Sequence, residues 1–266
     1  MKVAAIQMVS TADLAENLAT AATLLKKASD DGAKLLLLPE YWPLMGLKDT
    51  DKLALAEQAG SGVIQNFLSE TAKKLAVWIV GGTLPLVSSD TKKVFNTTLV
   101  YNPQGVALAR YDKIHLFGFT KADESCEESR TIVAGEKVVT FETDFGRVGL
   151  SICYDLRFPE LYRAMGTCSL IVVPAAFTFT TGQAHWEILL RARAIENQCY
   201  VLAAAQGGRH ANGRRTWGHS MLIDPWGKIV DVLDEGEGVV SGILELDLIE
   251  QIRDSLPALK HQKLRC

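Results

Sequence analysis

Residues 35–40 read LLLLPE, a wholly apolar run that closes with a proline and a single carboxylate. The apolar character starts after Lys34 and predicts a strand over residues 34–38 that is buried on both faces. A second run of the same form, CSLIVVP, occupies residues 168–174 and predicts a strand over 168–173 that ends at its own proline. Two such strands in distant parts of the chain predict two similar α/β halves.

Strand and helix patterns alternate around both runs. In the first half we expect strands at 3–9, 34–38 and 76–80 and helices at 13–29 and 63–75; in the second half we expect strands at 147–153, 168–173 and 199–204 and helices at 159–165 and 186–196. Each half then continues into a hairpin. The first joins arms 96–101 and 106–111 through Asn102–Gly105, and the second joins 220–223 and 229–233 around Asp224–Gly227. Both linkers have the residues of a type I turn.

This repeated order predicts an α/β fold made of two pseudo-twofold halves. Two sheets would stack inside, and helices would cover the outer faces. The chain has 266 residues, enough for one large domain or two small ones. No linker rich in Pro, Gly or Ser separates the halves, so we expect a single domain over residues 1–266.

Composition excludes several classes of function. The net charge is −3 and the pI about 6.0, whereas a nucleic-acid binder would carry a basic excess. No apolar run approaches the ~20 residues of a membrane span, and the first ten residues predict no signal peptide. We therefore expect a cytoplasmic protein. The five cysteines include no C-x-x-C pair, which argues against a disulfide framework and a thiolate zinc site.

One of these cysteines, Cys153, stands out by its place. It closes the predicted strand 147–153, and ligands bind at the carboxyl ends of strands in such sheets. Pro159 marks a helix start shortly after it, and a thiol near a helix N-terminus can have a lowered pKa. The alternative is a small buried apolar side chain without chemistry, the usual fate of a free cysteine.

Glu40 and Lys113 could serve the same chemistry. A half-buried Glu40 at the end of its strand would have a raised pKa and could act as a general base. An ammonium at Lys113, just past the first hairpin, would stabilise an oxyanion and favour a thiolate at Cys153. Taken singly, each residue has an ordinary alternative, a solvated glutamate and a surface lysine.

Three motifs resemble the nitrilase, or carbon–nitrogen hydrolase, superfamily. They are LPE at 38–40, YDKIHLF at 111–117 and GLSICYDLRFPE at 149–160. The resemblance covers nearly the whole chain and implies a four-layer αββα sandwich with Glu40, Lys113 and Cys153 as a catalytic triad. It also implies a supporting glutamate at Glu128, with Glu127 as the alternative. No metal or organic cofactor is implied. Members are usually dimers or larger, so we expect a homo-oligomer, with the tail from about residue 250 at a subunit interface.

Further blocks are similar to the Nit subgroup of amidases. They are AF at 176–177, TG at 181–182, AHWE at 184–187, LRARAIE at 190–196, QCYV at 198–201, AAAQ at 203–206, GRH at 208–210 and GHSM at 218–221. The resemblance implies hydrolysis of deaminated glutathione to α-ketoglutarate and cysteinylglycine through a thioester. Release of ammonia from α-ketoglutaramate, by an ω-amidase, is the main alternative. Two less favoured alternatives are a true nitrilase and a catalytically inactive family member that acts by binding a partner. Residues 118–126 depart from the pattern of the subgroup. We expect this segment to rim the pocket, so the choice of substrate stays open.

The implied reaction assigns two further roles. The backbone N–H of Tyr154 would join Lys113 in holding the oxyanion. Arg157 would grip the far carboxylate of the acyl group by two parallel hydrogen bonds, unless it pairs with Asp155 or Glu160. We expect structural roles for His185, Trp186, His210 and His219, because residues of these types more often serve packing or hydrogen bonding than catalysis.

Overall fold

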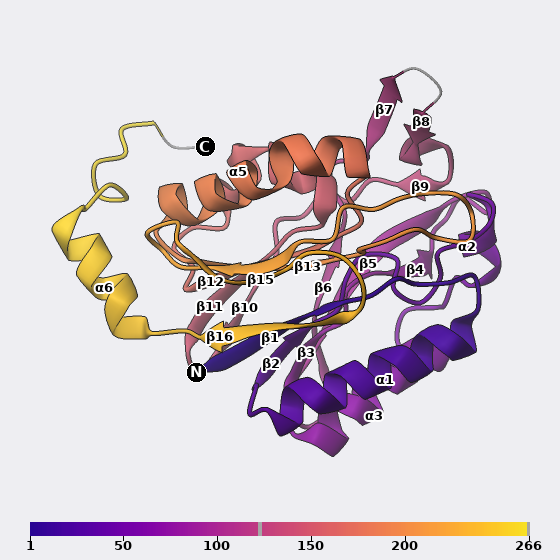
Figure 1. The fold of residues 1–266 in the computed structure, drawn as a ribbon, viewed down its shortest axis with the longest axis horizontal. Helices are drawn as coiled ribbons and strands as arrows, with labels where there is room; N and C mark the ends of the chain where they lie inside the picture. The colour runs from indigo at the N-terminus through magenta and orange to yellow at the C-terminus, as the bar shows by residue number, and fades with distance from the viewer. Residues whose placement is uncertain (122–123, 265–266) are drawn as a thin grey trace.

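Two β-sheets stack face to face in the computed structural model of the protein, which describes residues 1–121 and 124–264 (Figure 1). The first sheet runs β16 (Gly238–Ile243), β1 (Lys2–Gln7), β2 (Leu35–Leu37), β3 (Trp78–Val80), β5 (Val94–Tyr101) and β4 (Leu84–Val87), with β6 (Ala107–Asp112) and β9 (Ile132–Val133) also paired to β5. The second runs β10 (Thr140–Thr143), β11 (Gly146–Leu150), β12 (Leu170–Ala175), β13 (Tyr200–Ala205), β14 (Ser220–Ile223) and β15 (Ile229–Leu233). A separate hairpin, β7 (Gly118–Lys121) and β8 (Glu124–Glu127), projects from the body (Figure 1).

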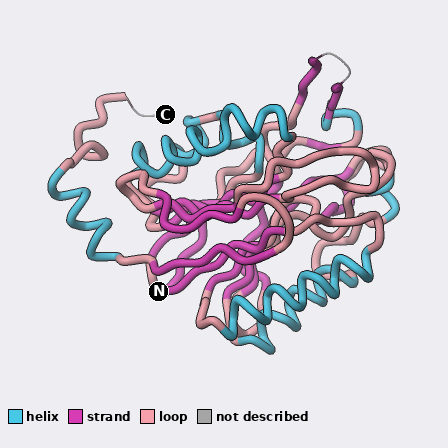
Figure 2. The backbone as a smooth tube through the Cα atoms, viewed as in Figure 1, coloured by secondary structure: helices cyan, strands magenta, loops and turns pink. Residues whose placement is uncertain are grey.

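Helices cover the outer faces of both sheets, as the tube in Figure 2 also shows. The helices of the described residues are α1 (Leu14–Asp30), α2 (Asp51–Ala54), α3 (Val63–Leu75), α4 (Pro159–Ala164), α5 (Phe179–Asn197) and α6 (Leu246–Ser255), with short 3₁₀ turns η1 (Glu128–Arg130) and η2 (Cys153–Arg157). Helices α1 and α3 lie against the first sheet, and α5 lies over the second. No helix in the described part of the chain is long and apolar enough to cross a bilayer.

The alternation of side chains along β1 explains the layers. Val3 and Ala5 are buried in one cluster with residues of the second sheet, such as Val148. Their neighbours Ala4 and Ile6 are buried in a second cluster with apolar residues of α1 and α3. Because successive side chains of a strand point to opposite faces, a wholly apolar strand can serve both interfaces. The four-layer αββα sandwich predicted from the sequence is confirmed.

The pseudo-twofold relation is visible in the strand order. Parallel strands β1, β2 and β3 lie between antiparallel β16 and β5, and parallel β11, β12 and β13 lie between antiparallel β10 and β14. Both predicted hairpins are also confirmed. The Gly105 N–H donates to the Asn102 carbonyl at 2.8 Å, and the Gly227 N–H donates to the Asp224 carbonyl at 2.9 Å. The φ angle is +78° at Gly105 and +85° at Gly227, a conformation that suits glycine at the last position of the turn.

The predicted strand 147–153 is too long. Strand β11 ends at Leu150, and Cys153 instead begins the 3₁₀ turn η2 with a φ of 49°. A left-handed φ is costly for a residue with a side chain and cannot belong to a strand. The chain therefore turns sharply at Cys153, which changes how its thiol is presented.

The predicted strand 168–173 is too short at its end, because β12 continues through Pro174 to Ala175. The Ala175 carbonyl accepts the Gln206 N–H beyond β13, so the nitrogen of Pro174 faces the other neighbour, β11. Strand β11 pairs with β12 only as far as Val172. Pro174 has no backbone N–H, but no β11 residue is paired at its position, so no hydrogen bond between the strands is lost there.

Helix α5 begins seven residues before the predicted start at 186, since the cap lies at Thr178. The hydroxyl of Thr178 accepts the N–H of Thr181 at 3.3 Å. The residues between the cap and Trp186 lack a clear apolar period, so their helical state depends on the cap and on tertiary packing.

Candidate active site

Glu40 lies just past the carboxyl end of β2, on a turn held by unusual backbone geometry. The next residue, Tyr41, has a φ of 55°. Gly82 packs directly behind the turn, where an added Cβ would lie 2.2 Å from the Pro39 carbonyl oxygen. Only glycine fits that close approach. The turn therefore fixes the direction of the Glu40 carboxylate.

Lys113 follows β6 and is fully buried, and its ammonium joins two carboxylates. Its Nζ lies 2.9 Å from Oε1 of Glu40, and 2.9 and 2.8 Å from the two oxygens of Glu128. Glu40 is completed by Asn96 Nδ2 at 2.9 Å on Oε1 and by the N–H of Ala176 at 2.9 Å on Oε2. Both carboxyl oxygens of Glu40 are thus oriented by donors.

Glu128, on η1, is the glutamate that reaches Lys113. Its carboxylate also accepts the Tyr41 hydroxyl at 2.6 Å and the Phe117 N–H at 2.7 Å. Glu127 is exposed and pairs with Arg130 on the surface. Of the two glutamates that the sequence left open, the structure brings Glu128 into the site.

The buried charges shift one another's pKa values. Burial raises the pKa of Glu40, and the positive charge of Lys113 opposes that shift only in part. Burial also acts on Glu128, but the charge and hydrogen bond of Lys113, with the Tyr41 hydroxyl and Phe117 N–H, lower its pKa. Burial disfavours the ammonium of Lys113, yet the charges of Glu128 and Glu40 raise its pKa well above the ordinary value. The pKa values of the two carboxyl groups that contact Lys113 are therefore shifted in opposite directions, up for Glu40 and down for Glu128.

Cys153 is buried beside Glu40, and its pKa differs from the sequence expectation. Burial and the nearby charge of Glu40 raise the pKa of the thiol well above its ordinary value, against the opposing charge of Lys113. The expected thiol with a lowered pKa is wrong, because desolvation outweighs the short turn that follows it. The Cys153 thiol lies within hydrogen-bond distance of the Glu40 carboxyl group.

A buried carboxylate two residues later stabilises the turn at Cys153. Asp155 accepts the N–H of Ile152 at 2.8 Å and the hydroxyl of Tyr111 at 2.7 Å. It also accepts the backbone N–H of His115 at 3.0 Å and lies 2.7 Å from that residue's Nδ1. The two motifs that contain Lys113 and Cys153 are therefore linked by a single buried side chain. Sequence reasoning gave Asp155 no such role.

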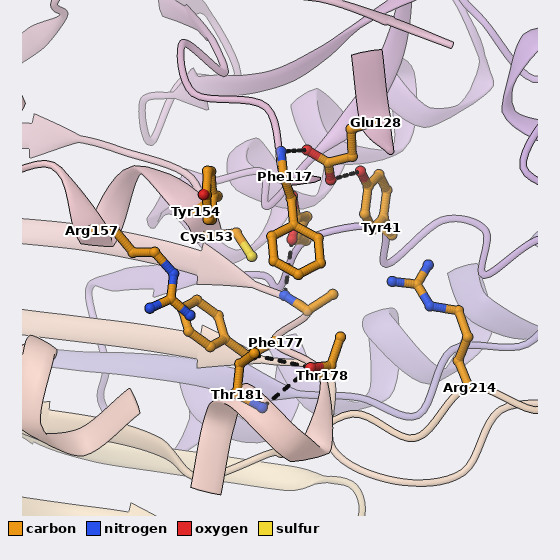
Figure 3. Close-up of a pocket in the computed structure, with 12 residues that line it drawn as sticks. Tyr41, Phe117, Glu128, Cys153, Tyr154, Arg157, Phe177, Thr178, Thr181 and Arg214 are labelled. Atoms are coloured by element: carbon orange, nitrogen blue, oxygen red, sulfur yellow. Dashed lines mark hydrogen bonds between the residues drawn. The ribbon is translucent and has the colours of Figure 1, made fainter. Parts of the chain in front are cut away.

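A pocket of about 310 Å³ opens over these groups (Figure 3). It is lined by Glu40, Tyr41, Phe117, Glu128, Cys153, Tyr154, Arg157, Ala176, Phe177, Thr178, Thr181 and Arg214. Within residues 1–121 and 124–264, no cluster of His, Cys, Asp and Glu side chains could hold a metal ion.

Arg157 lines this pocket without an acidic partner among the described residues. Its guanidinium lies over the rings of Tyr154 and Phe177, at 5.6 and 5.4 Å from their centres, and Nη1 lies 3.2 Å from His185 Nδ1. The alternative of an ion pair with Asp155 or Glu160 does not occur in the structure. Arg157 is therefore free to meet a ligand.

The four residues expected to be structural do not line the pocket. Trp186 is buried, and its indole N–H donates to the His219 carbonyl at 2.8 Å. His210 is buried between the Ser10 carbonyl and the Thr216 hydroxyl. The segment 118–126, expected to rim the pocket, includes residues 122–123, which lie outside the described residues.

The site residues that sequence reasoning missed include Tyr41, Asn96 and Arg214. Tyr41 directly follows Glu40, so its nearness was available from the sequence. Asn96 and Arg214 reach the site only through tertiary packing, from β5 and from the loop after β13. For these two the sequence carried no local signal that we recognised.

Comparison with known proteins agrees with this geometry. Residues 2–254 match the family described as Carbon-nitrogen hydrolase. Deaminated glutathione amidase of Synechocystis sp. is 43% identical over 265 residues, 97% of each chain. The human protein of that name is 37% identical over 98% of this chain and 82% of its own. The crystal structure of Saccharomyces cerevisiae Nit3, a member of branch 10 of the nitrilase superfamily, superposes with a TM-score of 0.89 at 32% identity, covering 99% and 97% of the chains. The chain belongs to the carbon–nitrogen hydrolase, or nitrilase, superfamily and is an amidase.

Proposed function

We propose that Cys153, Glu40 and Lys113 are the nucleophile, the general base and the oxyanion donor of this amidase. The observation that supports these roles best is the buried ammonium of Lys113, which bridges Glu40 and Glu128 beside the Cys153 thiol. A buried lysine between two carboxylates is costly to maintain for stability alone. Such strongly coupled groups at the base of a pocket are typical of catalytic sites.

The first half of the reaction acylates the enzyme. Glu40 accepts the thiol proton as the sulfur of Cys153 forms a bond to the amide carbon, and the carbonyl π electrons move to oxygen. Lys113 and the backbone N–H of Tyr154 hold the oxyanion. As the carbonyl reforms, the C–N bond breaks, and Glu40 gives its proton to the departing amine. A thioester on Cys153 remains.

The second half regenerates the thiol. Glu40 accepts a proton from water as the water oxygen attacks the thioester carbon, again forming an oxyanion. Collapse breaks the C–S bond, and the proton held by Glu40 returns to the sulfur. The sum is one amide and one water converted to one acid and one amine. The raised pKa of Glu40 suits a group that must both take and give a proton.

Glu128 supports the reaction without touching its atoms. Its paired contacts fix the position of the Lys113 ammonium, and Tyr41 and Phe117 in turn fix Glu128. Because Glu128 balances the charge of Lys113, Glu40 can change its protonation while the lysine stays in place.

For the substrate we propose deaminated glutathione, cleaved to α-ketoglutarate and cysteinylglycine. The names of the similar proteins from Synechocystis and human support this choice. Arg157 supports it as well, since an unpaired guanidinium in the pocket can grip the far carboxylate of the acyl group. An ω-amidase that releases ammonia from α-ketoglutaramate is the alternative, and it would form the same thioester.

We further propose that residues 1–266 form one catalytic domain that assembles as a homodimer or larger homo-oligomer in the cytoplasm. The core cluster that spans both sheets supports a single domain. Helix α6 and the segment after it lie at the side of the sandwich, with Leu256 and Leu264 exposed, which supports a role in subunit contact (Figure 1). A thiol nucleophile suits a reducing compartment.

A substrate assay tests the proposal. The purified protein is incubated with deaminated glutathione and with α-ketoglutaramate, and α-ketoglutarate, cysteinylglycine and ammonia are quantified. We expect kcat/KM for deaminated glutathione to exceed that for α-ketoglutaramate, and Cys153→Ala to cleave neither. A clear preference for α-ketoglutaramate would move the assignment to ω-amidase. Failure of the wild-type protein on every amide tested would reject the catalytic roles.

A further inference from the structure

The pocket contains a second arginine, Arg214, that the reaction described above does not use. It lines the pocket from the loop between β13 and β14 and is partly exposed. Figure 3 shows Arg157 and Arg214 on opposite sides of the Cys153 sulfur, with the Arg214 guanidinium directed toward Tyr41. The pocket thus presents one guanidinium at each end and the nucleophile between them.

The Arg214 guanidinium has no ion-pair partner among the described residues. Asp49 is the acid whose pKa is lowered in part by the charge of Arg214, but its carboxylate is already bonded to Lys52 at 2.6 Å and Thr131 at 2.8 Å. The carboxylates inside the pocket, Glu40 and Glu128, are committed to Lys113. Arg214 is therefore a cation at the pocket wall that makes no direct ion pair with an acid of the described residues.

The backbone that carries Arg214 is fixed. The Arg214 carbonyl accepts the His210 N–H at 2.9 Å, and its own N–H donates to Asn212 Oδ1 at 3.0 Å. Asn212 is tied to the Gly46 carbonyl at 2.7 Å, and the buried His210 ring is held by Ser10 and Thr216. A guanidinium on an ordered support loses little freedom when it binds an anion.

The position of Arg157 indicates which part of the substrate meets Arg214. In the proposed reaction Arg157 binds the acyl group, so the departing amine extends from Cys153 away from Arg157, toward the side of the pocket where Tyr41 lies. Arg214 borders that side and is close enough for its charge to act on the Tyr41 hydroxyl. Arg157 follows Cys153 on η2 and borders the other side. The two arginines therefore face the two opposite halves of a bound amide.

We propose that Arg214 binds a carboxylate at the far end of the amine leaving group, so that the pocket selects amides with an anion at each end. This inference rests on the proposed amidase reaction and names the chemistry of its leaving group: a short peptidic amine that ends in a free carboxylate. An ammonia-releasing substrate has no such group and does not engage Arg214.

Three amides with the same acyl group test the role. They are α-ketoglutaryl-cysteinylglycine, its C-terminal carboxamide and α-ketoglutaramate. We expect Arg214→Gln to lower kcat/KM for the free acid about 10- to 100-fold, the range for loss of a charge-assisted hydrogen bond. The carboxamide and α-ketoglutaramate should react at nearly the wild-type rate. Arg214→Lys, which keeps the charge but not the paired donors, should fall between.

The neighbouring Arg215 provides the matched control. It stacks on Phe179 and pairs with Glu235, and it does not line the pocket. Arg215→Gln should leave the ranking of the three amides unchanged. Binding is measured separately by calorimetry with Cys153→Ala protein, where the free acid should bind more tightly than the carboxamide only if Arg214 is intact.

Two outcomes would overturn the role of Arg214. Equal loss on all three amides would mean that Arg214 acts through the field at Tyr41 and Glu128 rather than on the leaving group. Undiminished turnover of the free acid by Arg214→Gln would exclude the contact. Both outcomes leave the amidase reaction standing, whereas wild-type protein inactive on all three amides would reject the proposed function itself.

Discussion

Lys113 holds Glu128 by both carboxylate oxygens, at 2.9 and 2.8 Å, but holds Glu40 by only one, at 2.9 Å. The paired contact is the stronger ion pair, and it leaves one oxygen of Glu40 to the Ala176 N–H. The asymmetry separates two carboxyls that touch the same ammonium. Glu128, whose pKa is lowered, is the carboxyl that we propose stays ionised beside the lysine, and Glu40, whose pKa is raised, is the one that we propose exchanges a proton with the thiol.

The first prediction concerns Lys113. In the sequence Lys113 follows a hairpin, as a surface lysine would, but the structure places it in the core between two carboxylates. Lys113→Ala should lose at least about 100-fold in kcat, as for loss of an oxyanion donor. It should also lose about 3–5 kcal/mol in the free energy of unfolding, because two buried carboxyls lose their counter-ion. Denaturant unfolding and steady-state kinetics measure the two effects.

A double variant separates folding from catalysis at Lys113. Lys113→Met with Glu128→Gln removes one charge of each sign and should recover part of the stability, while turnover stays low. Near wild-type kcat in either variant would remove Lys113 from the reaction.

The second prediction concerns pH. The reaction needs Glu40 as a carboxylate, so kcat/KM should rise with pH through the pKa of Glu40. Burial raises that pKa above its ordinary 4.5, so the acid limb of the profile should lie above pH 4.5. Glu128→Gln removes a negative charge that raises the pKa of Glu40, so the limb should move to lower pH. An unmoved limb in that variant would show that another group controls it.

The third prediction concerns the thiols. Cys153→Ala should lower kcat by about 10⁴-fold or more, as for removal of a covalent nucleophile. Alkylation of the native protein should abolish activity in step with modification of Cys153, mapped by mass spectrometry. Cys199, which is buried and does not line the pocket over Cys153, gives the matched control, since Cys199→Ala should keep its activity. Full activity after complete modification of Cys153 would rule out Cys153 as the nucleophile of the proposed reaction.

The fourth prediction concerns Asp155 as a positioning residue. Asp155→Asn places an amide where the carboxylate accepts the Ile152 N–H and the Tyr111 hydroxyl, so the turn at Cys153 should shift. We expect kcat to fall roughly 100-fold, the effect of a small misplacement of reacting groups, with little change in KM. Alkylation of Cys153 should slow in parallel.

Tyr111→Phe is the control for Asp155, because it removes one donor and leaves the Ile152 contact in place. Its kcat should fall much less. A variant Asp155→Asn with raised KM and wild-type kcat would contradict a positioning role.

The fifth prediction concerns Arg157. Lysine cannot reproduce the paired hydrogen bonds of a guanidinium, so Arg157→Lys should lose roughly tenfold or more in kcat/KM on α-keto dicarboxylic amides. Neutral short amides should be cleaved almost as before. Equal loss on charged and neutral amides would reject the role of Arg157 in recognition.

Much of the fold was predictable because its strands are local and apolar. Local composition alone predicts the strand at 35–38 and the turns at Asn102–Gly105 and Asp224–Gly227. The shape around Cys153 was not predictable in the same way, since its left-handed φ is imposed by the Asp155 contacts with Ile152 and distant Tyr111. The sequence motifs indicated that Glu40, Lys113 and Cys153 lie together. They could not give the pKa shifts of these groups, because those depend on burial in the folded protein.

The same limit explains the missed arginine. Arg214 follows an Asn-Gly pair, which predicts a turn but not what the turn faces. Its place at the pocket depends on contacts of His210 with Ser10 and of Asn212 with Gly46, near the start of the chain. Contacts over such separations leave no period or spacing in the sequence.

The pairing of β1 with β16 has a consequence for biosynthesis. Lys2 lies opposite Ile243, and the first strand must find its neighbour almost a whole chain length away. At a translation rate of about 5–20 residues per second, β1 waits on the order of 10–50 s before β16 leaves the ribosome. Until then the first sheet has an open edge, a surface on which strands of other nascent chains can pair. Closure of that edge is therefore one of the last steps of folding that synthesis of the chain permits.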